Sequence, residues 1–205
     1  MKRNQSRVGL RLARVLQKRA SATLVMLALV TAGTASVNSD YASIQRKFKQ
    51  IERQKLAPGT RIPLTPEELN AYVQKELPEV APPGIRNPVV VLNGNNAATG
   101  SALVDFVKLR SAEGKPPGFI LRTLLAGEHE LSVTTSIKSS GGVATVNLER
   151  VEIEGVPISG AALDFLVRNY LIPNYPDAKI GKPFQLKWRI DRIEVTPKLA
   201  YVITR

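Results

Sequence analysis

The longest continuous pattern of the chain runs from Glu128 to Pro173 and reads EHELSVTTSIKSSGGVATVNLERVEIEGVPISGAALDFLVRNYLIP. Residues 131–137 (LSVTTSI) place an apolar residue or Thr135 at every second position, which is the period of a half-buried strand. Residues 143–153 (VATVNLERVEI) alternate in the same way, but the apolar parity changes after Glu149-Arg150. One inserted residue, a β-bulge, produces such a change. With a turn at Ser139–Gly142, the pattern predicts a long antiparallel hairpin.

After a tight turn at Gly155–Pro157, the period of a strand gives way to that of a helix. Five residues recur at the i, i+3, i+4, i+7 and i+8 positions of one helix face. They are Leu163, Leu166, Val167, Tyr170 and Leu171. The hairpin is therefore expected to lead into a helix with one buried face.

The remaining elements follow from start and stop signals. Thr65 as N-cap, Pro66 at the first helical position and Glu68 completing a capping box predict a helix that ends at Pro78. The other expected segments are a linker at Pro58–Pro63, strands at Pro88–Asn93, Ala97–Leu109, Phe184–Ile190 and Leu199–Thr204, a bulge at Asp191-Arg192, and a short helix at Phe119–Ala126. The expected fold class is α+β, with a long curved antiparallel sheet of about five or six strands wrapped around amphipathic helices.

The positive charge of the chain is concentrated at its N-terminus. The formal net charge is +12, but residues 1–35 hold seven of the basic residues and no acid. The remaining 170 residues carry 22 basic and 17 acidic side chains, so they form only a mildly basic domain. We therefore expect no nucleic-acid partner. The chain has no cysteine, which excludes disulfides and thiol chemistry.

The apolar run Ala22–Ala35 (ATLVMLALVTAGTA) follows this basic flank and ends in small residues, as a secretory signal peptide does. The run is shorter than the ~20 residues that cross a bilayer comfortably, which favours cleavage. Retention as a signal-anchor is the alternative, and both outcomes export the rest of the chain to the periplasm or the exterior. The expected organisation is thus residues 1–35 as signal peptide or signal-anchor, 36–63 as basic helix and linker, and 64–205 as a single domain.

The segment Asp40–Leu56 carries a thin apolar stripe surrounded by basic residues. It is either a helix docked on its own domain or a helix held at an anionic membrane surface. We predict the membrane surface rather than the domain core. The side chains expected to contact the headgroups are Lys47, Lys49, Arg53 and Lys55.

Residues that could support catalysis are scarce. His129 is the only histidine, and it lies between Glu128 and Glu130 at the start of a strand, where an exposed surface residue is expected. The zinc motif HExxH, the phosphate-binding P-loop and the hydrolase motif GxSxG do not occur. Trp188 falls in the middle of an alternating run and is expected in the core. We predict a non-enzymatic protein without metal or cofactor.

The order of these features resembles that of small extracytoplasmic domains of the YpmS and LmeA kind, and more distantly tubular lipid-binding (TULIP-like) proteins. The residues that carry the resemblance are LTPEELNAYVQKEL (64–77), ATVNLERVEIEGVPIS (144–159), GAALDFLVRNYL (160–171), FQLKWRIDRIEV (184–195) and LAYVIT (199–204). The resemblance implies lipid binding in a groove between a helix and a curved sheet, outside the cytoplasmic membrane. It transfers no catalytic residue.

Two functions remain open from the sequence. In the first, an apolar groove binds lipid, and the residues expected to line it are Phe119, Leu121, Leu124, Leu163, Leu166, Val167 and Trp188. In the second, the core is solid and the domain is a structural or assembly module of the cell envelope that binds an unknown protein partner.

The signal segment generates a direct prediction. If Ala22–Ala35 is a cleaved apolar region, the exported protein begins near Ser36, because the small residues before it form the cleavage site. N-terminal sequencing of the exported protein measures this position. A sequence that still begins at Met1 would establish the signal-anchor instead.

Overall fold

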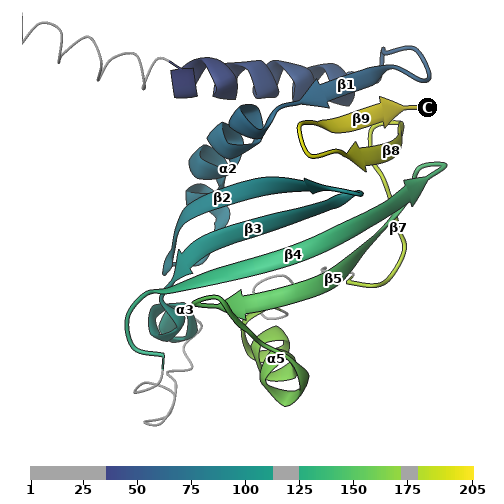
Figure 1. Ribbon diagram of the computed structural model, residues 1–205. Coiled ribbons are helices and arrows are strands. Elements are labelled where there is room, and N and C mark those ends of the chain that lie inside the picture. Colours follow the sequence, from purple (N-terminus) through teal and green to yellow (C-terminus); the bar gives the residue numbers. More distant parts are fainter. Residues whose placement is uncertain (1–35, 113–124, 172–179) are drawn as a thin grey trace, which may run out of the picture. The chain divides into compact units, whose positions relative to one another are not determined.

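The computed structural model describes residues 36–112, 125–171 and 180–205 (Figure 1). Residues 40–205 form one compact unit, and residues 36–39 belong to the N-terminal part of the chain. The described residues combine helices with a six-stranded antiparallel sheet and a second sheet of three strands. The expected α+β class and the antiparallel sheet are therefore confirmed.

The large sheet is built on the hairpin that the sequence predicted. Its strands are β2 (Ile85–Gly94), β3 (Ala97–Val104), β4 (His129–Ser140), β5 (Val143–Ile153) and β6 (Val156–Pro157), in that spatial order, with β7 (Phe184–Gln185) also paired to β5. Strands β4 and β5 join through Gly141-Gly142, and both residues have a positive φ, which two-residue hairpin turns of this kind require.

The bulge in β5 is confirmed. Thr134 pairs with Arg150 and Thr135 with Leu148, so Glu149 has no partner of its own on β4. The Glu149 side chain is exposed and accepts a hydrogen bond from the Ser136 hydroxyl.

The small sheet consists of β1 (Arg61–Leu64), β9 (Ala200–Thr204) and β8 (Ile190–Val195), in that order. The bulge expected at Asp191-Arg192 is present, since Ile190 pairs with Thr204 and Arg192 with Ile203. The linker expected at Pro58–Pro63 is wrong in its second half. The alternation of Arg61–Leu64 buries Ile62 and Leu64, and this burial drives the segment into β1.

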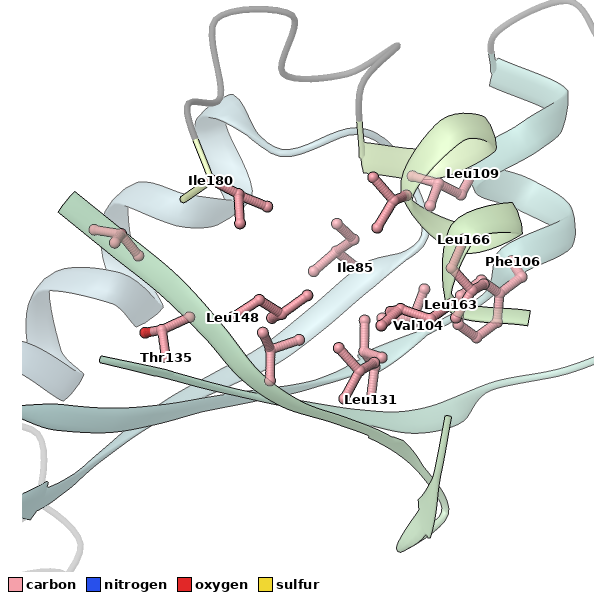
Figure 2. A pocket seen from close by; sticks show the side chains of 14 residues that line it. Ile85, Val104, Phe106, Leu109, Leu131, Thr135, Leu148, Leu163, Leu166 and Ile180 are labelled. Atoms are coloured by element: carbon pink, nitrogen blue, oxygen red, sulfur yellow. The ribbon is translucent and has the colours of Figure 1, made fainter. Parts of the chain in front are cut away.

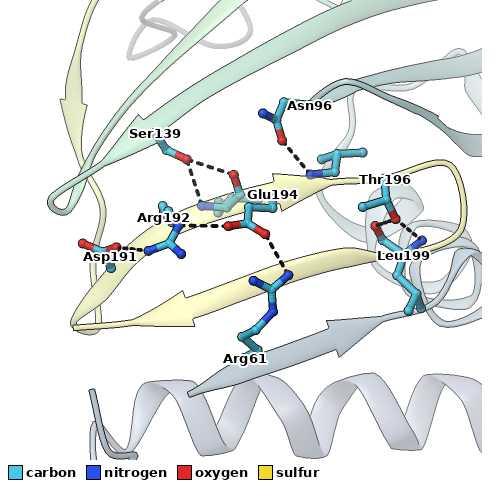
Figure 3. Close-up of polar contacts among 10 residues, drawn as sticks. Arg61, Asn96, Ser139, Asp191, Arg192, Glu194, Thr196 and Leu199 are labelled. Carbon is cyan, nitrogen blue, oxygen red and sulfur yellow. Dashed lines mark hydrogen bonds and ion pairs between the residues drawn. The ribbon is translucent and has the colours of Figure 1, made fainter. Parts of the chain in front are cut away.

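Hydrogen bonds to β8 join the two sheets (Figure 3). The Ser139 hydroxyl accepts from the Ile193 N–H at 2.8 Å and donates to the Ile193 carbonyl at 3.0 Å. Asn96 binds Val195 in the same way, with its N–H donating to the Val195 carbonyl at 3.0 Å and its Oδ1 accepting from the Val195 N–H at 2.9 Å. The outer edge of β8 is thus occupied, which prevents pairing with another strand.

The N-terminal helix (residues 36–52) packs into the main core from residue 40 onward. Ile44 is fully buried and Ile51 is 3% exposed, in one cluster with Ile62, Leu92 and Val202. The prediction that this segment lies outside the domain core is therefore wrong. The apolar stripe, although thin, covers the open side of the small sheet and α2. Of the four basic residues assigned to membrane contact, Lys49, Arg53 and Lys55 are exposed, whereas Lys47 is half-buried.

Helix α2 (Pro66–Val80) begins with the predicted capping box. The Thr65 hydroxyl accepts from the Glu68 N–H at 3.2 Å, and the Glu68 carboxylate accepts from the Thr65 N–H at 2.9 Å. The helix passes through Pro78, contrary to prediction, because a proline in the last turn loses only one hydrogen bond. Asn70 binds both the N–H and the carbonyl of Val90 at 2.8 and 2.9 Å, which ties α2 to β2.

Two predicted strands are shorter in the structure. Strand β3 ends at Val104, and helix α3 (Phe106–Ala112) follows because the Asp105 carboxylate accepts from the Lys108 N–H at 2.9 Å as an N-cap. The run at Phe184–Ile190 is a strand only at its two ends, in β7 and at Ile190, where β8 begins. Trp188 and Arg189 both have φ near 55°, so the chain turns there, and Trp188 is 45% exposed rather than in the core.

The helix expected after the hairpin is present as α5 (Gly160–Leu166) and continues as a π-helical turn, η1 (Val167–Leu171). Within the turn expected at Gly155–Pro157, Val156–Pro157 forms strand β6 by pairing with the end of β5. Of the helix predicted at Phe119–Ala126, residues 119–124 lie outside the described part, and Leu125-Ala126 is not helical. Within the described ranges, no helix has the length and apolar character needed to span a bilayer.

Glu68 generates a prediction on stability and pH. Its nearly buried carboxylate binds the Lys47 ammonium at 2.6 Å, the Ser43 hydroxyl at 2.7 Å and the Thr65 N–H. Burial acts to raise the pKa of Glu68, but these hydrogen bonds and the Lys47 charge outweigh it and hold the pKa below its usual 4.5. A carboxyl whose pKa is lowered by folding stabilises the protein above its unfolded pKa and loses that effect as the pH falls through its folded pKa.

The Glu68→Gln variant keeps the capping geometry and removes the charge. We expect its free energy of unfolding at pH 7 to be lower by about 1.5–3 kcal/mol, and the difference to shrink below pH 4.5. Urea denaturation at several pH values measures both. A difference that is constant from pH 7 to pH 3.5 would show that the charge of Glu68 does not stabilise the fold.

Candidate functional site

A partly enclosed cavity of about 320 Å³ lies between one face of the large sheet and helices α3 and α5 (Figure 2). Thirteen of its fourteen described lining side chains are hydrocarbon, and the hydroxyl of Thr135 is the single polar group among them. None of these described side chains is charged. The lining residues are Ile85, Val104, Phe106, Leu109, Leu131, Val133, Thr135, Val146, Leu148, Val151, Leu163, Leu166, Val167 and Ile180.

The hairpin supplies the sheet wall of the cavity. On β4, residues 131, 133 and 135 share one face because successive side chains of a strand alternate. On β5, Val146 and Leu148 have the opposite parity from Val151, yet all three line the cavity. The extra residue at the Glu149 bulge shifts the alternation by one position, so the side chains before and after it face the same side of the sheet. The parity change in the sequence is therefore the local feature that makes this face of β5 apolar along its whole length.

Helix α3 forms part of the opposite wall with Phe106 and Leu109, which are 2% and 5% exposed. Two hydrogen bonds of Asp105 hold the start of this helix. Asp105 caps its first turn, and the Asp105 N–H donates to the Gly84 carbonyl at 2.8 Å. A Cβ at Gly84 would lie 2.9 Å from the Asp105 carbonyl oxygen, so only glycine permits this approach.

Helix α5 and its π-helical extension complete the wall with Leu163, Leu166 and Val167 (Figure 2). This wall is held less firmly than α3. Ser159 occupies the N-cap position without a capping hydrogen bond from its side chain, and no residue of α5 is fully buried. Helix α5 therefore depends on the apolar contacts of its inner face.

The structure brings together part of the predicted groove. Leu163, Leu166 and Val167 lie at the cavity, as their spacing on one helix face suggested. Trp188 does not line it and lies on the surface. The other three predicted residues, Phe119, Leu121 and Leu124, lie outside the described residues.

Sequence reasoning missed the sheet wall and α3. The alternation in β4 and β5 correctly predicted which side chains share a face of the sheet. It did not predict a cavity, because an alternating strand packs equally well on a solid core. Phe106 and Leu109 were assigned to a strand, and the signal that would have found them is Asp105, a good N-cap residue before an apolar pair.

The one histidine of the chain lies near the cavity but is not among its described lining residues. The His129 ring lies 6.3 Å from the Phe106 ring, and its Nδ1 lies 3.6 Å from a Glu154 carboxylate oxygen. The expectation that His129 is exposed is wrong, since its side chain is only 22% exposed. Its Nε2 is buried and forms no hydrogen bond to a described residue. Among the described residues, no group of three or more potential ligands could hold a metal ion. The lining side chains offer no group that could donate or accept a proton apart from one hydroxyl.

No protein-family model matches the chain, and no curated protein matches it in sequence. The function must therefore be argued from the geometry of the cavity and from the chain's own sequence.

The Asp105 cap generates a prediction on the α3 wall. Asp105→Ala removes the acceptor for the Lys108 N–H, and we expect a loss of about 1 kcal/mol in the free energy of unfolding. Asp105→Asn keeps an acceptor and is the matched control, with an expected change of a few tenths of a kcal/mol. Urea denaturation at pH 7 compares the two. Equal losses would show that the carboxylate charge, rather than the cap, holds the helix.

Proposed function

We propose that this protein is a non-enzymatic binding protein that holds a lipid acyl chain, or another apolar ligand, in the cavity between α3, α5 and the hairpin. The single observation that carries the proposal is the composition of the lining, with thirteen hydrocarbon side chains and one hydroxyl. Ligand sites are mostly apolar and contain a few polar groups that orient the ligand, and Thr135 is the group available for that role.

The physical argument concerns water. A buried water molecule needs two to four hydrogen-bond partners, and the side chains of the described lining residues offer one hydroxyl. Water in the cavity is therefore held poorly, and an apolar ligand that displaces it gains the hydrophobic free energy of both surfaces. The ligand would also give the inner face of α5 a packing partner that the helix otherwise lacks.

The size of the cavity supports one chain rather than several. A volume of about 320 Å³ is at the lower end of the range of ligand pockets, roughly 300–1,000 Å³. At roughly 30 Å³ for a group of the size of water, it accommodates on the order of ten such groups. A single acyl chain fits this volume, and a polar headgroup would remain outside.

The signal segment and the order of elements support the same proposal. Residues 1–35 favour export, so the ligand would be met outside the cytoplasmic membrane, in the periplasm or at the cell surface. The proposal includes the arrangement expected for TULIP-like proteins, in which a curved sheet packs around helices. A cavity between helix and sheet agrees with that arrangement.

A second function is favoured by a different surface. Val80, Val89 and Val91 are 71%, 39% and 53% exposed, at the end of α2 and on edge strand β2. Exposed apolar side chains of this kind suit an envelope module that contacts a protein partner. Addition of a partner strand is blocked at Val90, whose backbone groups are bound by Asn70, so the contact would be made by side chains.

The experiment that separates the two functions uses the full chain purified from membranes in mild detergent. We expect native mass spectrometry to show bound lipid, and Val133→Phe, which enlarges a side chain of the cavity lining, to reduce its occupancy about ten-fold or more. Val91→Phe, on the exposed edge, is the matched control and should leave occupancy unchanged. Thermal unfolding establishes that both variants fold. Absence of lipid in repeated preparations, or equal occupancy in Val133→Phe, would overturn the proposal.

A further inference from the structure

The turn Lys187–Ile190, here called the Trp188 turn, has an unusual backbone. The Ile190 N–H donates to the Lys187 carbonyl at 3.1 Å, and the two central residues, Trp188 and Arg189, both have φ near 55°. Turns with two positive φ values normally contain Asn or Gly, because larger side chains crowd the backbone there. A bulky residue in this conformation is an outlier, and such strain persists where surrounding contacts enforce it.

Those contacts are present on both sides of the turn. The Leu186 N–H donates to the Gly142 carbonyl at 2.8 Å, and the Gly142 N–H donates to the Asp191 carbonyl at 2.8 Å. The Arg205 N–H donates to the Arg189 carbonyl at 2.7 Å. The turn is therefore fixed at the tip of the β4–β5 hairpin. Nevertheless, the Trp188 side chain is 45% exposed, so its strained position contributes little to the core.

The side chains next to Trp188 are cationic. Lys187 and Arg189 flank it in the chain, and the Arg205 guanidinium lies against the hairpin turn, with Nη1 donating to the Gly141 carbonyl at 3.1 Å. In the described part of the chain, no carboxylate forms an ion pair with these three residues. Asp191, the nearest acid along the chain, is paired with Arg192 at 2.8 Å.

We propose that the Trp188 turn is an interfacial anchor that docks this protein on an anionic lipid surface. Tryptophan concentrates at the level of lipid headgroups because its ring is apolar and its N–H is polar. Basic residues beside it are attracted by the negative potential of anionic lipids. Lys187, Trp188 and Arg189 are exposed in the turn. Arg205, also exposed, is joined to the turn by its backbone hydrogen bond to Arg189.

The position of the anchor relates it to the cavity. Strand β5 connects them, since Gly142 contacts the turn and Val146 lines the cavity, a separation of four residues or about 13 Å along the strand. Docking would bring the cavity close to the lipid surface. The inference goes beyond the proposed function and stands without it, because membrane docking does not require a ligand in the cavity.

The chain provides its own probe, because Trp188 is its only tryptophan. Full-length protein is mixed with vesicles of phosphatidylglycerol or of phosphatidylcholine, and tryptophan emission is recorded. We expect a blue shift, and quenching by brominated acyl chains, with phosphatidylglycerol. Both should be weaker with phosphatidylcholine and in 1 M salt, where the Debye length falls to about 3 Å. Emission that is the same with and without anionic vesicles would overturn the proposal.

Two triple variants remove equal charge from different surfaces. Lys187→Gln with Arg189→Gln and Arg205→Gln should weaken binding to phosphatidylglycerol vesicles by about 100-fold, from roughly five-fold per basic residue. The matched control, Lys49→Gln with Arg53→Gln and Lys55→Gln, alters exposed residues at the end of the N-terminal helix and in the segment after it, and should weaken binding by less than three-fold. Segment 22–35 is present in both and contributes the same background. Equal weakening would show attraction by net charge alone and overturn the anchor.

Trp188→Asn separates an anchor from a structural role. Asparagine tolerates positive φ, so we expect an unchanged or higher Tm together with vesicle co-sedimentation that is weaker by about ten-fold or more. A lower Tm with unchanged co-sedimentation would assign Trp188 to the fold. Quenching of wild-type emission by single-stranded oligonucleotides, without any response to vesicles, would assign the turn to nucleic-acid binding and would also overturn the proposal.

Discussion

The unpaired residue in β5 decides which side of the central hairpin is apolar. In a regular strand, residues 146 and 148 would face opposite to residue 151, and the two ends of β5 would place their apolar side chains on different faces of the sheet. The extra residue at Glu149 changes the phase, so both ends face α3 and α5. The Glu149 side chain remains on the solvent side, where Ser136 binds it. A continuous apolar wall, and with it the cavity, depends on this one insertion.

The described residues divide their apolar side chains between two clusters with different roles. The first, around Ile44, Ile62 and Val202, contains side chains from the N-terminal helix, the small sheet and β2, with residues of α2 packed against it. The second, around Val104, Phe106 and Leu109, is closed by α3 but only partly by α5. The first cluster stabilises the unit, and Glu68 with its three polar partners connects its helices. The second cluster leaves a space that close packing would normally fill, and the proposed ligand would occupy this space.

The two proposals use neighbouring parts of the same hairpin. Val146 and Leu148 face the cavity, and Gly142 receives the hydrogen bond that fixes the Trp188 turn. A hydrogen-bonded hairpin suits this combination, because its strand pairing fixes the position of the cavity wall relative to the surface turn. Strand β8 contributes to the same rigidity, since Ser139 and Asn96 bind its outer edge in the manner of neighbouring strands.

The sequence by itself determined the features that depend on residues close together along the chain. The hairpin with its Gly141-Gly142 turn, both bulges and the capping box of α2 follow from parity and local hydrogen bonding, and all are present. Helical spacing placed Leu163 and Leu166 on one buried face, and the resemblance to TULIP-like proteins assigned that face to a groove. Only the tertiary structure decided features that depend on distant partners. Strand β1 exists because β9 pairs with it, and the N-terminal helix is buried because the small sheet needs a cover. Trp188 lies on the surface because hydrogen bonds to Gly142 and Arg205 hold its neighbours in a turn, although its alternating neighbours along the chain resemble a strand. Periodicity states which residues share a face, but not which element covers that face or whether space is left between them.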